Sequence, residues 1–278
     1  MPEGPEVKKT VDYLKSAFKN NKSIKDIEIV SGRYAKGKPF QGYNDMSFEI
    51  PLKVAKVSCK GKFIYFTMQY KVNETCAKVF HMFSTLGMTG MWSQEKTKHS
   101  RFSILFDDET YLYYNDVRNF GTLKFVHQTS ELNKKLSSLG PDMLSETLTK
   151  DEFKSRLLKR KKKTIVEALM DQSVVSGVGN YLKSETLYAA GIKPSRTVES
   201  LTEAEFDNLN KSIHNIIRVS YNQGGATIKN YRQPNGKSGV FSRRFAVYNC
   251  KTDPYNNIIV KEKTKDGRST FWVPELQK

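Results

Sequence analysis

The spacing of apolar residues changes partway along this 278-residue chain. Near the start, Val7, Val11, Leu14 and Phe18 fall on one face of a helix, and after them the pattern shortens to the two-residue period of strands. The second half instead carries signals for the starts and ends of helices. A chain of this length is long for one domain and comfortable for two, so we expect two domains of different construction.

The first half predicts a β-sandwich with one leading helix. We expect that helix from about Pro5 to Lys19, because proline suits a first helical turn. Strand-like segments follow at residues 24–30, 63–70, 78–83, 101–106 and 110–114, with Asp107-Asp108-Glu109 at the tip of the last hairpin. Several short, closely spaced strands predict an α+β fold whose first domain spans residues 1–130.

The second half predicts helices. Thr149 with Glu152, and Thr202 with Glu205, each fit a capping box that opens a helix. Gly191 followed by Pro194, and later Gly224-Gly225, indicate where helices end. We therefore place the domain boundary in the segment from Gln128 to Ser145, and we expect a linker over residues 131–148 and a helical domain over residues 149–278.

Two further segments of this half have other patterns. Residues 171–181 predict a helix, a double turn and a new helix, because Gly177 and Gly179 interrupt the helical pattern. Residues 247–273 predict strands around an Asp266-Gly267 turn. We find no internal repeat in the sequence.

The charge of the chain indicates a polyanionic partner. Lys and Arg number 46 against 29 Asp and Glu, which gives a net charge of +17. A hydrophobic content of 38% excludes a disordered basic tail. Residues 150–163 contain eight basic residues, among them Lys161 and Lys162, and residues 208–252 contain no acidic residue. A short lysine run alone is equally typical of a solvated helix face or a localisation signal, but the long acid-free stretch favours nucleic acid.

The sequence has no apolar run of membrane-spanning length and no apolar leader, so we expect a soluble intracellular protein. It leaves open a nuclear, viral or cytoplasmic DNA compartment. The cysteines Cys59, Cys76 and Cys250 are odd in number and far apart. This spacing argues against both a disulfide framework and a zinc site made of cysteines.

The first residues offer a nucleophile. Removal of Met1 before a small residue would leave Pro2 with a free secondary amine, and an α-amino group has a pKa of about 8. Its attack on a sugar C1′ would give an iminium, the electron sink for base loss and strand elimination. Glu3 and Glu6 would supply carboxylates for proton transfer. The alternative is a chance Met-Pro start with ordinary acidic capping of a helix.

Six separated segments together resemble one family. They are Pro2-Glu3-Gly4-Pro5-Glu6, Lys60-Gly61-Lys62-Phe63, Leu86-Gly87-Met88-Thr89-Gly90, Asp116-Val117-Arg118-Asn119-Phe120-Gly121, Gly177-Val178-Gly179-Asn180-Tyr181 and the ending from Gly267 to Gln277. In this order they resemble the Fpg/Nei family of DNA glycosylases. The resemblance implies a bifunctional DNA glycosylase/AP lyase of base excision repair, which removes oxidised bases through an N-terminal proline Schiff base and cleaves the abasic strand by β,δ-elimination.

The resemblance also implies roles for the catalytic candidates. Pro2 would be the Schiff-base nucleophile, Glu3 the acid/base that opens the deoxyribose, and Lys62 a general acid or phosphate clamp. Glu6 stays a candidate for proton transfer, and Arg268 would reach the DNA near the lesion. Without the family register, Lys62 is a solvated charge and Arg268 an ordinary surface residue on a hairpin.

The DNA-binding candidates fall into two groups. Met88, Arg118 and Phe120 match the trio that fills the gap left by an extruded base, although Met and Phe are more often core residues. The other group would contact phosphates, with Asn180 alternatively serving only as a helix N-cap; it comprises His99, Asn180, Tyr248, Lys161 and Lys162.

The chain departs from the family pattern at its finger, residues of about 247–278. Most members bind zinc there through four cysteines, but the corresponding positions hold Tyr255, Ile258, Val273 and Leu276. These side chains cannot ligate zinc. We therefore expect a zincless finger, held by apolar packing, and neither a metal nor another cofactor.

Two smaller departures concern DNA contacts. Asn119 replaces the family's second arginine, and residues 165–167 lack a lysine that many bacterial members have. The cues for the lesion conflict, because the start of the chain resembles the Nei side and the end resembles plant formamidopyrimidine enzymes.

The expected partner is damaged duplex DNA, with single-stranded DNA left open, no membrane, and a monomeric protein. The alternative function is a catalytically silent module that binds damaged DNA or other nucleic acid. The intact set of Pro2, Glu3 and Lys62 favours the enzyme, because binding alone places no demand on a free N-terminal amine.

Overall fold

A computed structural model describes residues 2–18, 22–71, 77–227 and 239–278. Met1, Cys76 and residues 228–238 of the acid-free stretch lie outside the described residues. The chain divides into two compact units. Among the described residues, the sheet unit comprises Pro2 and most of residues 6–137, and the helical unit comprises Glu3–Pro5, Ser138–Ala226 and Val240–Lys278.

The sheet unit is built from one long helix and an eight-stranded antiparallel sheet. Helix α1 (Gly4–Ala17) buries Val7, Val11 and Leu14 as its apolar spacing predicts. The sheet has the order β5-β7-β6-β1-β2-β3-β4-β8. Its strands are β1 (Ser23–Glu28), β2 (Leu52–Lys60), β3 (Phe63–Lys71), β4 (Ala77–Thr85), β5 (Gly90–Ser93), β6 (Ser100–Phe106), β7 (Tyr111–Asp116) and β8 (Thr122–Val126).

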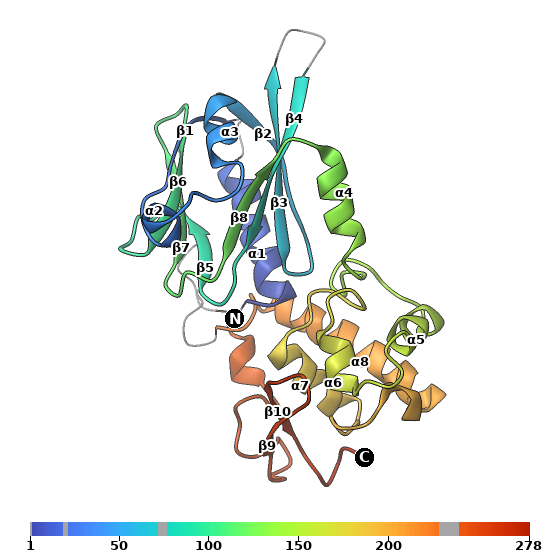
Figure 1. The fold of residues 1–278 in the computed structure, drawn as a ribbon. Helices are drawn as coiled ribbons and strands as arrows, with labels where there is room; N and C mark the ends of the chain where they lie inside the picture. Colours follow the sequence, from blue (N-terminus) through green and yellow to red (C-terminus); the bar gives the residue numbers. More distant parts are fainter. Residues whose placement is uncertain (1, 19–21, 72–76, 228–238) are drawn as a thin grey trace. The chain divides into compact units, whose positions relative to one another are not determined.

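The sheet folds over so that its two halves face each other, as the ribbon of this unit shows (Figure 1). Strands β3 and β5 stand five places apart in the strand order, yet the rings of Phe66 and Trp92 pack with their centroids 5.5 Å apart. The Tyr114 hydroxyl on β7 likewise donates to the Thr85 carbonyl on β4 at 2.8 Å. The expected β-sandwich with a leading helix is confirmed.

Several elements of this unit escaped the sequence prediction. Strand β2 was missed because a bulge shifts its pairing between Val54 and Lys56 and so breaks the two-residue period. Strands β5 and β8 are too short to show a period. Three helices were also missed, α2 (Arg33–Lys36), α3 (Tyr43–Phe48) and α4 (Thr129–Ser137), the last of which occupies much of the expected linker.

The helical unit follows the predicted start and stop signals. Its helices are α5 (Lys150–Leu158), α6 (Ile165–Met170), α7 (Asn180–Ala189) and α8 (Glu203–Asn222), with short 3₁₀ turns η1 (Val198–Ser200) and η2 (Phe241–Arg244). Both predicted capping boxes are confirmed, at Thr149 with Glu152 and at Thr202 with Glu205. Helix α8 ends before Gly224, whose φ of 79° is in the left-handed region that glycine favours.

The finger is a two-stranded hairpin of β9 (Val260–Lys263) and β10 (Ser269–Trp272) around the predicted Asp266-Gly267 turn. The strand prediction was wrong for residues 247–259, which form turns and loops. No helix in the described part of the chain is long and apolar enough to cross a membrane.

Candidate active site and nucleic-acid interface

The helical unit holds the carboxylate of Glu3 at the start of α7. Its two oxygens accept hydrogen bonds from the backbone N–H groups of Tyr181, at 3.0 Å, and Leu182, at 3.2 Å. These are among the donors that a helix leaves unpaired in its first turn. Gly179 permits the approach, because a Cβ built there would lie 2.2 Å from Glu3 Cδ. Glu3 is 2% exposed, so the carboxylate has a fixed orientation.

The double turn that precedes α7 is stabilised by two side chains. Gln172 receives a hydrogen bond from the Gly177 amide at 3.1 Å and donates to the Val178 carbonyl at 2.9 Å. Asp171 accepts from the Ser173 amide at 2.9 Å and from Arg160 Nε, also at 2.9 Å. The backbone adds a bond from the Gly4 amide to the Gly177 carbonyl at 2.8 Å. The predicted helix, double turn and helix are confirmed, and Glu3 is bound at the start of the second helix.

The other predicted catalytic residues of the N-terminal half lie in the sheet unit. Pro2 is buried immediately before Glu3 in the chain, and Glu6 is 1% exposed in the first turn of α1. Lys62 is half-buried in the two-residue turn between β2 and β3. Gly61 has a φ of 56° at the first position of that turn, as type II′ hairpins require.

The sheet unit brings the predicted gap-filling trio together on two loops. Met88 lies between β4 and β5, and Arg118 and Phe120 lie between β7 and β8. Arg118 Nη1 contacts Met88 Sδ at 3.0 Å, and the guanidinium stacks over the Phe120 ring at 4.7 Å. Phe120 is 54% exposed, so the core alternative is wrong for this residue. The three side chains together form one continuous surface of apolar and planar groups.

Close packing under these loops fixes their positions. A Cβ on Gly121 would lie 1.6 Å from the Tyr114 hydroxyl, and one on Gly87 would lie 2.6 Å from the Gly121 amide nitrogen. The buried carboxylate of Asp116 accepts from the Gly121 amide at 2.8 Å and from the Thr89 hydroxyl. Thr89 in turn accepts from the Arg118 amide at 2.9 Å. Asp116 therefore ties one loop to the other.

His99 lies beside the same loops. Its carbonyl accepts from the Asp116 amide at 2.9 Å, and its Nδ1 lies 3.5 Å from a guanidinium nitrogen of Arg101. Arg101 also donates through Nε to the Asp116 carbonyl at 2.8 Å. The side chain of His99 is half-buried at the base of the second loop.

The predicted contacts of the helical unit gather where α7 meets the finger. Asn180 is the first residue of α7, and Gly179 takes the N-cap position, so the N-cap alternative for Asn180 is wrong. Its amide donates to the Ser269 carbonyl at 2.8 Å. Tyr248 packs edge-on against Phe271 at 5.1 Å, and burial raises its pKa. Arg268 is exposed directly after the hairpin turn.

The finger does contain apolar packing, but only one of the four family cysteine positions takes part in it. Val273 is buried in a cluster with Val247 and Phe271, whereas Tyr255 is 77% and Ile258 is 72% exposed and Leu276 is also exposed. Polar groups hold the loop that carries Tyr255 and Ile258. Asp253 accepts from the Tyr255 amide at 2.9 Å, from the Asn257 amide at 2.8 Å and from the Tyr188 hydroxyl at 3.0 Å.

These four side chains provide no zinc ligand. The described residues also contain no group of three or more His, Cys, Asp or Glu side chains that could hold a metal ion.

The lysine run lies between α5 and α6. Lys161 and Lys162 are exposed there, in a turn anchored by the bond from the Glu199 amide to the Lys161 carbonyl at 3.1 Å. Their neighbour Lys163 pairs with Glu167 at 3.2 Å, and Arg160 pairs with Asp171. The two central lysines therefore present their charges to solvent.

Three buried charged residues near the site were not predicted from the sequence. Asp116 was inside a quoted motif but had no assigned role. Glu185 accepts backbone hydrogen bonds from residues 246, 247 and 248 at 2.8–3.0 Å and so positions Tyr248. Lys183 forms an ion pair with Asp266. In the sequence, Lys183 is only a charged residue next to the family motif. Its partner Asp266 is 83 residues away, so helical periodicity does not reveal the pair.

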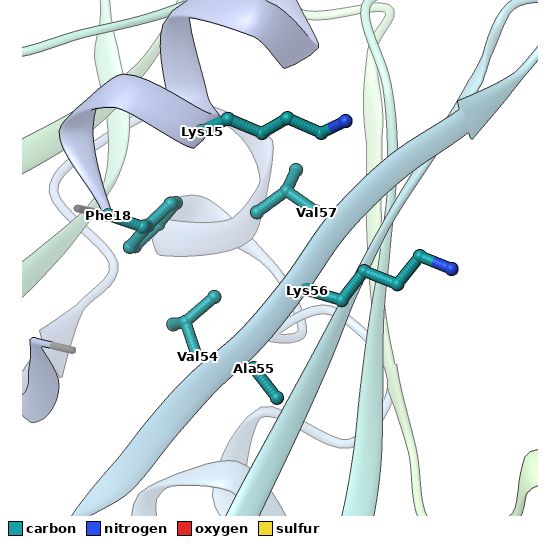
Figure 2. A pocket seen from close by; sticks show the side chains of 6 residues that line it. All are labelled: Lys15, Phe18, Val54, Ala55, Lys56 and Val57. Atoms are coloured by element: carbon teal, nitrogen blue, oxygen red, sulfur yellow. The ribbon is translucent and has the colours of Figure 1, made fainter.

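The sheet unit also has two small surface pockets, and none of the candidate residues lines either of them. One of about 210 Å³ opens between α1 and β2 (Figure 2), where two lysines flank an apolar floor; it is lined by Lys15, Phe18, Val54, Ala55, Lys56 and Val57. The other, of about 290 Å³, is lined by Ser23, Pro51, Lys53, Gln69 and Tyr70.

Comparison with known proteins covers the chain almost from end to end. Residues 1–123 match the model of the formamidopyrimidine-DNA glycosylase N-terminal domain, and residues 139–232 match the formamidopyrimidine-DNA glycosylase H2TH domain. A formamidopyrimidine-DNA glycosylase of a Wolbachia sp. is 32% identical over 286 residues, covering 100% of both chains. One of an Exiguobacterium sp. is 30% identical, covering 100% of this chain and 99% of its own.

Solved structures give the same result. The MutM (Fpg) protein of Thermus thermophilus superposes with a TM-score of 0.83 at 27% identity, covering 99% of this chain and 98% of its own. Wild-type Lactococcus lactis Fpg (MutM), in complex with DNA that contains an oxidized pyrimidine, gives a TM-score of 0.83 at 26% identity and covers 100% of both chains.

Proposed function

This chain belongs to the formamidopyrimidine-DNA glycosylase family, and we propose that it is a bifunctional DNA glycosylase/AP lyase that removes oxidised bases from damaged duplex DNA. The observation that carries the proposal is the fixed position of the Glu3 carboxylate. This carboxylate directly follows Pro2 and is held by two N–H groups at the start of α7. A module that only binds DNA has no need to fix a carboxylate beside a potential amine nucleophile.

The proposed reaction uses that pair of residues. With Met1 removed, the Pro2 nitrogen attacks C1′ of the damaged nucleotide and gives its proton to Glu3, and the base leaves C1′ with the bonding electron pair. Glu3 passes this proton to the ring oxygen of the deoxyribose, which opens the sugar and leaves an iminium between Pro2 and C1′. Loss of the C2′ proton to a carboxylate converts the iminium to an enamine, whose electrons expel the 3′ phosphate, and loss of the C4′ proton then expels the 5′ phosphate. Lys62 protonates or binds the departing phosphate, and Glu6 assists proton transfer.

The proposed DNA contacts divide between the two units. Met88, Arg118 and Phe120 fill the space of the extruded base, because they form one exposed apolar and planar surface. Phosphates are bound by side chains that carry positive charge or donate hydrogen bonds, and these are His99, Asn180, Tyr248, Arg268, Lys161 and Lys162. The finger works without zinc, since its family cysteine positions hold residues that cannot ligate a metal.

Base release from duplexes that each carry one oxidised base, followed by borohydride reduction, tests the proposal. We expect free base, cleavage at the abasic site and a covalent protein–DNA adduct after reduction. Tight binding of damaged DNA with neither base release nor an adduct would instead establish the silent binding module. The same panel of oxidised purines and pyrimidines, in duplex and single-stranded form, determines the preferred lesion.

A further inference from the structure

The helical unit contains a buried ion pair to which the reaction above assigns no role. Lys183 Nζ lies 2.6 Å from Asp266 Oδ2, and the two side chains are 0% and 5% exposed. Burial lowers the pKa of Lys183, and the attraction of Asp266 opposes this effect only in part. Burial also opposes ionisation of Asp266, but the hydrogen bonds from Lys183 and Thr264 outweigh it, so the pKa of Asp266 lies below its usual range. The lowered pKa of Asp266 keeps its carboxylate ionised, and both side chains are removed from water.

Lys183 belongs to a face of α7 that binds the finger. Asn180, Lys183 and Ser184 follow the spacing of one helical face. Asn180 donates to the Ser269 carbonyl at 2.8 Å, and Ser184 accepts from the Phe271 amide at 3.5 Å. The N-terminal end of the same helix binds Glu3. Helix α7 thus connects the catalytic carboxylate with the hairpin.

Asp266 organises the turn that presents Arg268. Its second oxygen accepts from the Thr264 hydroxyl at 2.5 Å and from the Arg268 amide at 3.3 Å. Gly267 between them has a φ of 76°, and open space surrounds the position of its missing Cβ. The conformation of the turn therefore depends on the Asp266 carboxylate rather than on steric packing around Gly267.

An ion pair is a poor choice if stability alone is needed at this place. Removing two charges from water costs more than their attraction commonly returns, and apolar replacements of such pairs are often neutral or stabilising. A buried charge, however, is stable only next to its partner, so the pair permits only one alignment of helix α7 with the hairpin. The ion pair is therefore better suited to positioning the hairpin on α7 than to stabilising the fold.

We propose that Lys183 and Asp266 are positioning residues, which fix Arg268 on the hairpin relative to Glu3 at the start of α7. This role rests on the proposed glycosylase/AP lyase function and adds to it a determinant of the rate of the chemical steps. The pair acts through Arg268 and Glu3 and does not itself contact the DNA. Its loss should slow base release on bound DNA and leave the strength of DNA binding nearly unchanged.

The test compares single-turnover base release by the full-length protein and three variants at saturating damaged duplex. The central variant is the double replacement Lys183→Met with Asp266→Asn, because it leaves no lone buried charge and the introduced asparagine retains an acceptor for Thr264 and the Arg268 amide. We expect its rate to fall about 10- to 100-fold, since small displacements of catalytic groups have effects of this order. Its Kd for undamaged duplex should stay within about threefold of the wild-type value, since phosphate contacts dominate that affinity.

Two further variants separate positioning from general weakening. Arg268→Ala alone, and Arg268→Ala combined with the double replacement, should release base at the same rate, because residues that act through one another give non-additive effects. Lys154→Met is the matched control, since it removes an ion pair with Glu203 from the same unit. This control should match the wild-type rate. Thermal unfolding establishes that every variant is folded at the assay temperature.

The outcomes distinguish this inference from the function on which it rests. Wild-type protein that neither releases base nor forms an adduct with borohydride overturns the proposed function itself. Active wild-type protein with a double variant of equal rate overturns the positioning role. So does a double variant whose rate loss simply multiplies with that of Arg268→Ala, because this result indicates a structural effect that is independent of Arg268.

Discussion

The two units fix their candidate residues by different physical means. In the sheet unit, Phe120 and its neighbours are exposed on loops that Asp116 ties together and whose backbone is tightly packed, as the clash of a Cβ on Gly121 with Tyr114 shows. In the helical unit, buried polar contacts fix the candidate residues instead. Glu3 is held by backbone N–H groups, and Asp266 is held by Lys183.

This difference determines which changes should damage each unit. Packing that fixes a loop fails when volume is added beneath it, even if every charge is kept. Buried polar contacts fail when a charge or a hydrogen-bonding group is altered, even if the volume is kept. Three predictions use this contrast.

The largest effect should come from removing the charge of Glu3. Glu3→Gln keeps the size of the side chain but removes the proton-transfer group, so base release should slow by about 10²- to 10⁴-fold. Binding of a duplex with an abasic-site analogue should change little. Glu152→Gln, which alters the capping carboxylate of α5, is the control and should retain the wild-type rate. Equal rates for Glu3→Gln and the control would remove Glu3 from the mechanism.

A smaller effect should follow from adding one methyl group beneath the loops of the sheet unit. Gly121→Ala introduces a Cβ that must displace Tyr114 or the loop, and overpacking of this kind costs about 1–3 kcal/mol. Denaturant unfolding measures this cost, and fluorescence of a base analogue in the DNA measures the loss of base extrusion.

Gly37→Ala is the matched change for this prediction, because its Cβ would meet only the Arg33 carbonyl, at 3.2 Å. We expect its stability to change by less than about 0.5 kcal/mol. Similar stability for the two alanine variants would show that packing does not define these loops.

The smallest effect concerns one histidine in each unit. Burial lowers the pKa of both His81 and His214. His81 contacts the hydroxyls of Thr67 and Thr129, which can donate or accept. His214 donates from Nδ1 to the Met143 carbonyl and accepts the Leu148 amide at Nε2. A proton on Nε2 would face that amide, so only His214 loses a hydrogen bond when protonated.

The direction of the pH effect follows from the lowered pKa. As the pH falls below about 6.5, the unfolded chain binds protons before the folded one, and stability is lost. The loss should reach at most about 1.4 kcal/mol per pH unit for each histidine. Hydrogen exchange of the Leu148 amide should accelerate between pH 7 and 5, after correction for the intrinsic rate, relative to His214→Gln. Hydrogen exchange in peptides around Thr67, which contacts His81, should accelerate less. A larger acceleration around Thr67 than at Leu148 would contradict the contrast between the two units.

The same contrast explains how much the sequence predicted. Periodicity, turn and capping signals located α1, most strands, the double turn and the main helices of the second half, because these depend on neighbours close in sequence. The trio of Met88, Arg118 and Phe120 was identified through the family resemblance of the segments that contain it. The polar partners were not, since Asp266 meets Lys183 and residues 246–248 meet Glu185 only after the chain has folded. Strand β2 was not predicted because its bulge interrupts the two-residue period.

The central claim is that the Pro2 amine forms the covalent intermediate. Wild-type protein, with its N-terminal residue first established by mass spectrometry, is reduced with borohydride on abasic-site duplex and digested. Mass spectrometry then identifies the residue that carries the sugar. The account predicts the adduct on the nitrogen of Pro2 in a chain that has lost Met1, and an adduct on Lys62 or another lysine would contradict it.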